Sequence, residues 1–218
     1  MASTYSQADR RSARRARTIE DALDAAEAIM REQGVGGLSM SEVARRLGMR
    51  QPSLYKYFSS LHALFDALFA RGLARTDAAV TAAIRRRPPG VPRLRAGARA
   101  LMRWAVENPA LAQLLYWRPV PGFEPSAETF AASRDQMATV RTELAAAAGS
   151  GQLRAAAATD EALLLYTVVI SGVISQQLAN EPGASFAAGR FSRLTDEALD
   201  MYFARYAPAG GTDADPRP

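Results

Sequence analysis

Apolar and polar residues alternate along most of this chain with the period of an α-helix. Near the start, Ile19, Leu23, Ala26, Ile29 and Met30 recur every three or four residues, which places them on one face of a helix. No alternation of the β type extends over any length. The pattern therefore predicts an all-α protein of about nine helices: four between residues 18 and 84, then Arg93–Glu107, Pro109–Trp117, Glu124–Ala148, Thr159–Asn180 and Phe186–Tyr206.

Capping residues predict where the first helices begin and end. Thr18, with Asp21 three residues later, is a suitable N-cap for the first helix, and Ser39–Glu42 forms a capping box for a short second one. Gly48 tolerates the left-handed turn that ends the second helix, and Pro52 suits the first turn of a third, which is expected to run to about residue 58.

Positive charge is concentrated in the first part of the chain. Residues 1–87 contain 15 Lys or Arg and 9 Asp or Glu, whereas residues 88–218 contain 12 and 13. Residues 1–17 hold five arginines and almost no large apolar side chain, so we expect a flexible basic arm there. A basic N-terminal part beside a near-neutral remainder suggests that a polyanion binds the former.

Composition excludes several kinds of chemistry. Without cysteine there are no disulfides and no thiolate catalysis, and His62 is the single histidine. We find no glycine-rich phosphate loop, no nucleophile elbow and no metal-ligand spacing. An enzyme is therefore the weaker hypothesis, and no cofactor or metal is expected. No apolar run approaches the ~20 residues of a membrane span, so we expect a cytoplasmic protein that does not enter a membrane.

The segment Glu42–Phe58 has the features of a helix-turn-helix. The small Ala44 lets two helices cross closely, and Gly48 follows at the turn between them. Apolar residues such as Val43 and Leu54 would lie behind the crossing, which leaves polar and aromatic side chains of the third helix outside. Such a helix beside a basic arm is suited to reading the major groove of DNA.

Together with its surroundings, this segment resembles the DNA-binding domain of the TetR family. The resemblance covers about residues 18–68 and rests on the run from Leu23 to Gly34 and on Ser39, Val43-Ala44, Leu47-Gly48 and Leu54-Tyr55-x-Tyr57-Phe58. It implies a homodimer, a double-stranded operator with two half-sites, and repression that a small-molecule effector relieves. Three positions depart from the family pattern, namely Arg50 in place of Ser or Thr, Tyr57 in place of His, and Leu61 in place of Lys.

On this basis we expect the DNA contacts to be Arg50, Gln51, Pro52, Ser53, Tyr55, Lys56, Tyr57, Ser39, Arg45 and Ser60. The alternative for the polar residues is an ordinary solvated helix face. Tyr55 could instead be a half-buried core aromatic, and Arg45 could simply be solvated.

The C-terminal part is rich in large apolar and aromatic residues over a limited span. We expect an apolar effector pocket lined by Met102, Arg103, Trp104, Tyr116, Trp117, Phe123, Phe130, Met137 and Tyr166. Each of them alone would more often be a core residue. The last two predicted helices are strongly apolar, and the resemblance favours a dimer interface at Leu164, Val168, Leu194, Leu199 and Tyr202, although their periodicity equally allows a monomer core.

The predicted organisation is a flexible arm (1–17), a helix-turn-helix domain (18–64), a helical ligand-sensing and dimerisation domain (65–207) and a disordered tail (208–218). The predicted function is a ligand-responsive transcriptional regulator, in the first place a repressor released by a small, largely apolar molecule. The alternatives are an activator or ligand-independent regulator of the same fold, and, less favoured, an enzyme or a nonspecific nucleoid-type DNA binder.

Overall fold

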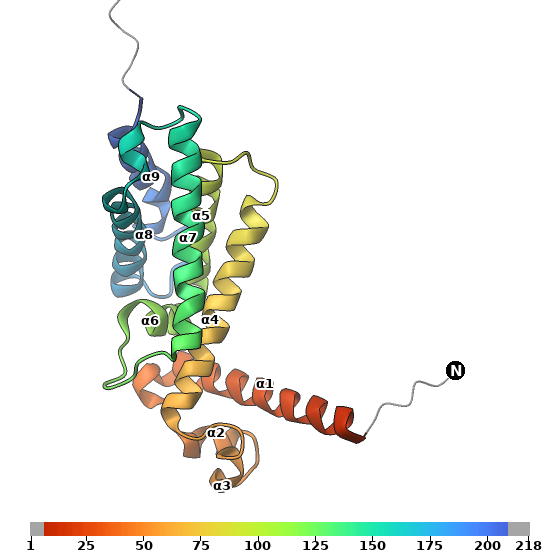
Figure 1. Cartoon of the computed structure of the whole chain (residues 1–218). Coiled ribbons are helices and arrows are strands. Elements are labelled where there is room, and N and C mark those ends of the chain that lie inside the picture. The colour runs from red at the N-terminus through yellow and green to blue at the C-terminus, as the bar shows by residue number, and fades with distance from the viewer. Residues whose placement is uncertain (1–6, 209–218) are drawn as a thin grey trace, which may run out of the picture. The chain divides into compact units, whose positions relative to one another are not determined.

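The computed structural model describes residues 7–208, which form helices and connecting turns (Figure 1). The described part holds nine α-helices: α1 (Gln7–Gln33), α2 (Met40–Arg46), α3 (Gln51–Leu54), α4 (Leu61–Ile84), α5 (Val91–Glu107), α6 (Pro109–Trp117), α7 (Ala127–Gly149), α8 (Asp160–Asn180) and α9 (Thr195–Arg205). Short 3₁₀ turns occur at Val35–Gly37, Ala155–Ala158 and Ser192–Leu194. The predicted all-α class is confirmed.

The chain packs as two compact units. Unit 1 extends to Gly72 and includes Ala110–Phe130, and unit 2 holds Leu73–Pro109 and the chain from Ala131 onward. The part of α4 up to Gly72 and most of α6 thus pack with the N-terminal helices, whereas the boundary expected from the sequence lay between residues 64 and 65. Residues 1–6 of the predicted arm and 209–218 of the predicted tail lie outside the described residues.

Helix α1 begins at Gln7 and not at the predicted Thr18, so residues 7–17 of the predicted arm are helical. Thr18 lies inside the helix, where its hydroxyl donates to the Arg14 carbonyl over 3.0 Å. Alanine and arginine are strong helix formers, and their run continues the helix toward the N-terminus. A long-range contact also holds this part, because the Arg15 guanidinium donates to the Lys56 carbonyl over 3.0 Å.

The helix-turn-helix is built by the local signals that the sequence carries. The Ser39 hydroxyl oxygen caps α2 by accepting from the Glu42 amide over 3.2 Å. Gly48 has a φ of +65°, the left-handed turn that ends α2, and Pro52 lies in the first turn of α3. Regular α3 ends at Leu54, but turns continue to Phe58, whose amide donates to the Leu54 carbonyl over 3.1 Å. Both of these apolar side chains are buried.

An ion-pair cluster centred on the nearly buried Arg71 and Glu27 joins α1 to α4 within unit 1. Arg71 of α4 donates to the carboxylates of Asp24 over 2.6 Å and Glu27 over 2.7 Å, and also to that of Glu20. The side chains of Arg71 and Glu27 are only 10% and 9% exposed. The exposed Arg31 lies 3.9 Å from the Glu27 carboxylate.

On another side of α4, the segment before α7 is anchored by an aromatic cluster and a polar cap. The Phe123 ring lies 5.8 Å from that of Phe65 and 6.4 Å from that of Phe69, between centroids. Asp66 accepts from the Ser126 amide over 2.8 Å and from the Thr129 hydroxyl over 3.2 Å. The beginning of α4 is therefore held both by α1 and by the segment that leads into α7.

Two buried tyrosines hold the core of unit 2 together. The Tyr166 hydroxyl of α8 donates to the Leu94 carbonyl of α5 over 2.6 Å, and the Tyr202 hydroxyl of α9 donates to the Ala162 carbonyl of α8 over 3.0 Å. Their rings meet edge to face with centroids 5.3 Å apart. Burial raises the pKa of both phenols, so they stay protonated and keep donating their hydrogen bonds.

We expect Arg71→Met to lower the stability of unit 1 strongly, by about 2–4 kcal/mol, because it removes a cation from the nearly buried Glu27 carboxylate. Arg31→Met is the matched control, since it removes an exposed cation near the same carboxylate and should cost less than about 1 kcal/mol. Thermal and urea unfolding of the two variants measure the difference. Equal losses in both variants would contradict the structural importance of the cluster.

Candidate nucleic-acid interface and effector site

The α3 turn presents most of the predicted DNA contacts to solvent. Arg50, Gln51, Pro52 and Lys56 are exposed, and Ser53 and Tyr57 are half-buried. Tyr55 is 46% exposed, so it lies on the outer face and not in the core. Arg50 stands at the N-cap of α3 without a capping side-chain hydrogen bond, and its guanidinium is not engaged in closing the helix.

Arg15 of the predicted basic arm is a further candidate contact, which was not singled out among the DNA contacts expected from the sequence. Its guanidinium lies over the Tyr57 ring, 5.2 Å from the centroid, besides its hydrogen bond to the Lys56 carbonyl. The contact places an exposed positive charge of α1 beside the C-terminal end of α3. The unbroken run of helix-forming residues before Thr18 was a signal that the helix continues to Arg15. The contact itself joins residues 41 positions apart, and no local pattern predicts it.

Arg45 and Arg46 on α2 are already paired with carboxylates. Arg45 forms a two-fold contact with Glu42, with nitrogen–oxygen distances of 2.7 and 2.8 Å, and Arg46 contacts Glu42 over 3.1 Å and Glu32 over 3.0 Å. The hydrogen bond from Arg45, followed by that from Arg46, lowers the pKa of Glu42 to about 2. Glu42 is therefore ionised near neutral pH, and a DNA phosphate would compete with it for Arg45.

Ser39 and Ser60 act as helix caps. The Ser60 hydroxyl oxygen accepts from the Ala63 amide over 3.1 Å, as Ser39 does for α2. A capping serine accepts through its oxygen and still has a hydroxyl proton to donate. Both remain candidates for phosphate contact, whereas the neighbouring Leu61 is half-buried and carries no charge.

The predicted effector residues are divided between the two units. In unit 1, Phe123 is buried in the aromatic cluster on α4, and Tyr116 is half-buried. Trp117 and Phe130 are 40% and 38% exposed, and the Arg118 guanidinium lies 5.8 Å from the centroid of the Phe130 ring. These four aromatics are therefore not equivalent, because Phe123 is buried, Tyr116 is half-buried and the other two reach the surface of unit 1.

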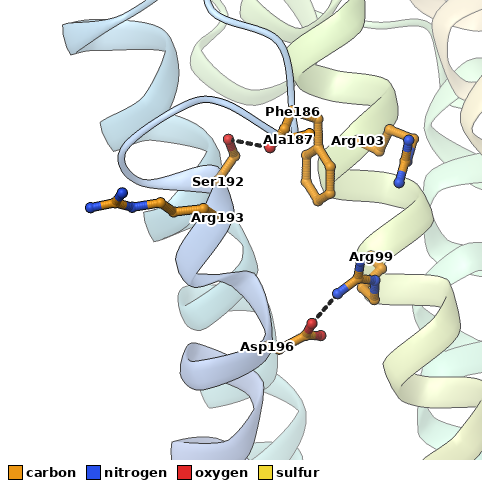
Figure 2. A pocket seen from close by; sticks show the side chains of 7 residues that line it. All are labelled: Arg99, Arg103, Phe186, Ala187, Ser192, Arg193 and Asp196. Carbon is orange, nitrogen blue, oxygen red and sulfur yellow. Dashed lines mark hydrogen bonds and ion pairs between the residues drawn. The ribbon is translucent and has the colours of Figure 1, made fainter.

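In unit 2, the predicted effector residues lie on different faces. Met102, Trp104 and Tyr166 are buried, and the Thr195 hydroxyl approaches the Met102 sulfur at 3.4 Å. Met137 is 38% exposed. Arg103 lies over the Phe186 ring, 4.9 Å from the centroid, and lines a pocket of about 210 Å³ between α5 and the start of α9 (Figure 2). It is thus separated from Met102 and Trp104 although adjacent in sequence.

Burial divides the predicted dimer contacts into two groups. Leu199 is fully buried and Tyr202 is 2% exposed, because both face the core of unit 2. Leu164, Val168 and Leu194 are exposed, as expected for interface residues, and so is Met201 of α9. Of the residues predicted for an apolar dimer interface, Leu164, Val168 and Leu194 are thus available on the surface.

Two further properties of the described residues bear on function. No group of three or more His, Cys, Asp or Glu among residues 7–208 could hold a metal ion. Helix α8 is the one described helix whose length and apolar composition would suffice to cross a membrane. It packs against α5 and α9, an arrangement that a core helix of a globular protein also shows.

If α2 lies near DNA, Glu42→Gln should strengthen binding, because it frees Arg45 to neutralise a phosphate while keeping the amide that Ser39 caps. We expect affinity to rise alike for all DNA sequences, and the salt dependence of log K to steepen by about 0.9 for each phosphate gained. Fluorescence anisotropy at several salt concentrations measures both. An unchanged salt slope would place α2 away from the DNA backbone.

Comparisons with known proteins agree with this architecture. Residues 22–68 match the family model described as "Bacterial regulatory proteins, tetR family", and residues 94–202 match the model "Tetracyclin repressor-like, C-terminal domain". An HTH-type transcriptional regulator of Mycobacterium tuberculosis is 40% identical over 97 residues, which is 42% of this chain and 40% of that protein. The match therefore spans about two fifths of the length of that curated relative.

Solved structures share the fold over nearly the whole chain. The transcriptional regulator FadR from Bacillus subtilis, in complex with stearoyl-CoA, superposes with a TM-score of 0.71 at 14% identity, covering 85% of this chain and 97% of its own. AibR, in complex with isovaleryl coenzyme A and operator DNA, gives 0.66 at 17% identity, covering 85% and 97%.

The two family models together cover both the helix-turn-helix and most of the chain that follows it. Their order along the chain is that of a DNA-binding module followed by a helical C-terminal domain, as the described helices show. The chain belongs to the TetR family of bacterial regulatory proteins, a non-enzymatic family of DNA-binding transcriptional regulators.

Proposed function

We propose that this regulator is a homodimeric repressor that a small, largely apolar effector releases from its operator. The observation that carries the proposal is the exposed face of α3 beside the basic N-terminal half of α1. Within that face, Gln51 and Ser53 lie at the end of α3 that enters the major groove in helix-turn-helix proteins. Lys56 can reach a base edge or a phosphate, while Tyr57 and Arg15 are suited to phosphate contact.

A dimer is supported by the apolar surface of α8. Leu164 is 65% exposed and Val168 61%, and they are one helical turn apart, so they share a face. Met201 of α9 is 76% exposed. Exposed apolar side chains at regular spacing mark an association surface more often than an isolated exposed residue does. An operator with two half-sites then requires two copies of α3, which a dimer supplies.

The apolar effector is supported by two kinds of observation. FadR and AibR, which share the fold, were solved with stearoyl-CoA and isovaleryl-CoA, and both ligands carry an acyl chain. In this chain, the aromatic cluster around Phe123 packs on the first turns of α4, directly after the helix-turn-helix. An effector that displaces Phe123 or the cap at Asp66 would move the start of α4 and thereby α3. Operator release needs only such a shift, since two copies of α3 must match the helical repeat of DNA.

Operator binding in the presence of acyl-CoA tests the proposal. An operator selected from random DNA by the purified protein should lose at least ten-fold affinity when stearoyl-CoA or isovaleryl-CoA saturates the protein. Free coenzyme A is the control and should not release the DNA. An operator affinity that no acyl-CoA and no compound of an apolar library lowers would contradict effector-released repression.

Val168→Glu should convert the dimer into monomers, because it buries an unpaired carboxylate in the proposed interface. Ala145→Glu on the exposed side of α7 is the matched control and should leave the dimer intact. Light scattering distinguishes the 23.5 kDa protomer from a particle of twice that mass. A Val168→Glu protein that keeps the dimer mass would locate the interface elsewhere.

A further inference from the structure

Arginines on α5 and carboxylates on α9 form an ion-pair ladder. Arg95 pairs with Asp200 over 2.6 Å, and Arg99 pairs with Asp196. Moving four residues forward along α5 corresponds to moving four residues back along α9, as expected for neighbouring helices of opposite direction. Each step is about one helical turn, so successive pairs are stacked on the same two faces.

The next step of the ladder lacks its carboxylate. Arg103 continues the arginine row, and the register places residue 192 opposite it, where the chain has serine. Ser192 is 1% exposed, and its hydroxyl donates to the Phe186 carbonyl over 2.7 Å. Among the described residues, no carboxylate lies within ion-pair distance of Arg103, whose guanidinium stacks on Phe186 instead.

A pocket of about 210 Å³ lies at this incomplete step. It is lined by Arg99, Arg103, Phe186, Ala187, Ser192, Arg193 and Asp196. Figure 2 shows the side chains of Arg99 and Arg103 on the α5 side of the space, with Phe186 across from Arg103, whereas the Arg193 side chain extends away from it. The volume exceeds the ~30 Å³ of one water molecule several-fold, so a small organic acid fits.

The wall opposite α5 is held by buried polar contacts. Gln177 of α8 is fully buried, and its carbonyl oxygen accepts from the amides of Phe191 over 3.2 Å and Ser192 over 3.0 Å. The side-chain nitrogen Nε2 of Gln177 donates to the backbone carbonyl of Glu181 over 2.9 Å. These bonds hold Phe191 and Ser192 in place, and the Ser192 hydroxyl in turn bonds the Phe186 carbonyl, so this wall of the pocket is fixed.

We propose that this pocket binds an oxyanion, with Arg103 as its main ligand and Arg99 as its neighbour. The guanidinium groups of Arg99 and Arg103 carry two positive charges, and the Asp196 carboxylate compensates one of them. The carboxylate of a bound ligand, or a phosphate monoanion, neutralises the other. The planar guanidinium donates two parallel hydrogen bonds to either group. The bound oxyanion completes the third step of the ladder. This site goes beyond the proposed function, because it can be filled without operator DNA and without an apolar effector.

The test is an NMR titration of the full-length protein in which the Nε–Hε signals of the arginine side chains are followed. Sodium acetate and sodium phosphate are added separately at constant ionic strength, with chloride as the balancing anion. Loss of one signal in the Arg103→Gln protein assigns Arg103. We expect a saturable shift of that signal in the unmodified protein.

Variants show whether the shift reports this pocket. In the Arg103→Gln protein, oxyanion binding is followed at the Arg99 signal and should be weakened at least ten-fold. Arg103→Lys should retain part of the affinity. Arg86→Gln, which removes the same charge from an exposed turn, should change nothing at Arg99. Saturation by acetate identifies a carboxylate site, and saturation by phosphate alone identifies a phosphate site. An Arg103 signal that does not saturate with either anion, or an Arg99 response that survives Arg103→Gln, would overturn the proposal.

Discussion

The nearly buried guanidinium of Arg71 is the constraint on which the DNA-binding part of this protein depends. A nearly buried cation is tolerated only when carboxylates surround it, and Glu27, Asp24 and Glu20 all come from one helix, α1. The requirement fixes α1 against α4, and the helix-turn-helix lies between those two helices in the chain. The aromatic cluster around Phe123 and the cap formed by Asp66 connect α4 to the segment before α7. A displacement of the first turns of α4 therefore also displaces α3.

The proposed DNA-binding surface carries some arginines that are exposed and others that are paired with carboxylates. The N-terminal half of α1 presents exposed arginines, which favour any polyanion irrespective of sequence. On α2, Glu42 and Glu32 neutralise Arg45 and Arg46. A surface that neutralises part of its own charge loses nonspecific affinity and leaves a larger share of the binding energy to base contacts at α3. We infer that Glu42 contributes to the ratio of specific to nonspecific binding.

Local signals in the sequence predicted the helix-turn-helix well. Ser39, Gly48 and Pro52 each act within a few residues, through a cap, a left-handed turn and a fixed φ, and the structure has all three. The start of α1 was missed although the helix-forming residues before Thr18 were a local signal, because Thr18 was taken as the N-cap. The contact of Arg15 with residue 56 is one that no local pattern records.

Helix phase and register were harder to predict in unit 2. Helix α9 is apolar on more than one side, so its periodicity did not reveal that Leu199 and Tyr202 face the core while Met201 faces outward. Arg103 was grouped with its sequence neighbour Trp104, although adjacent helical positions point about 100° apart. The ladder on α5 and α9 emerges only from the register of two helices that are far apart in sequence.

The central claim is that α3 reads the bases of an operator, and Gln51→Ala tests it most directly. Binding of the variant is compared with that of the unmodified protein on a selected operator and on every single-base-pair change within one half-site. Loss of a good base contact removes about 1–3 kcal/mol of discrimination, roughly ten-fold or more, so preference should relax at one base pair per half-site and remain at the others. Full affinity and unchanged preference at every position would contradict the assignment of α3 as the recognition helix.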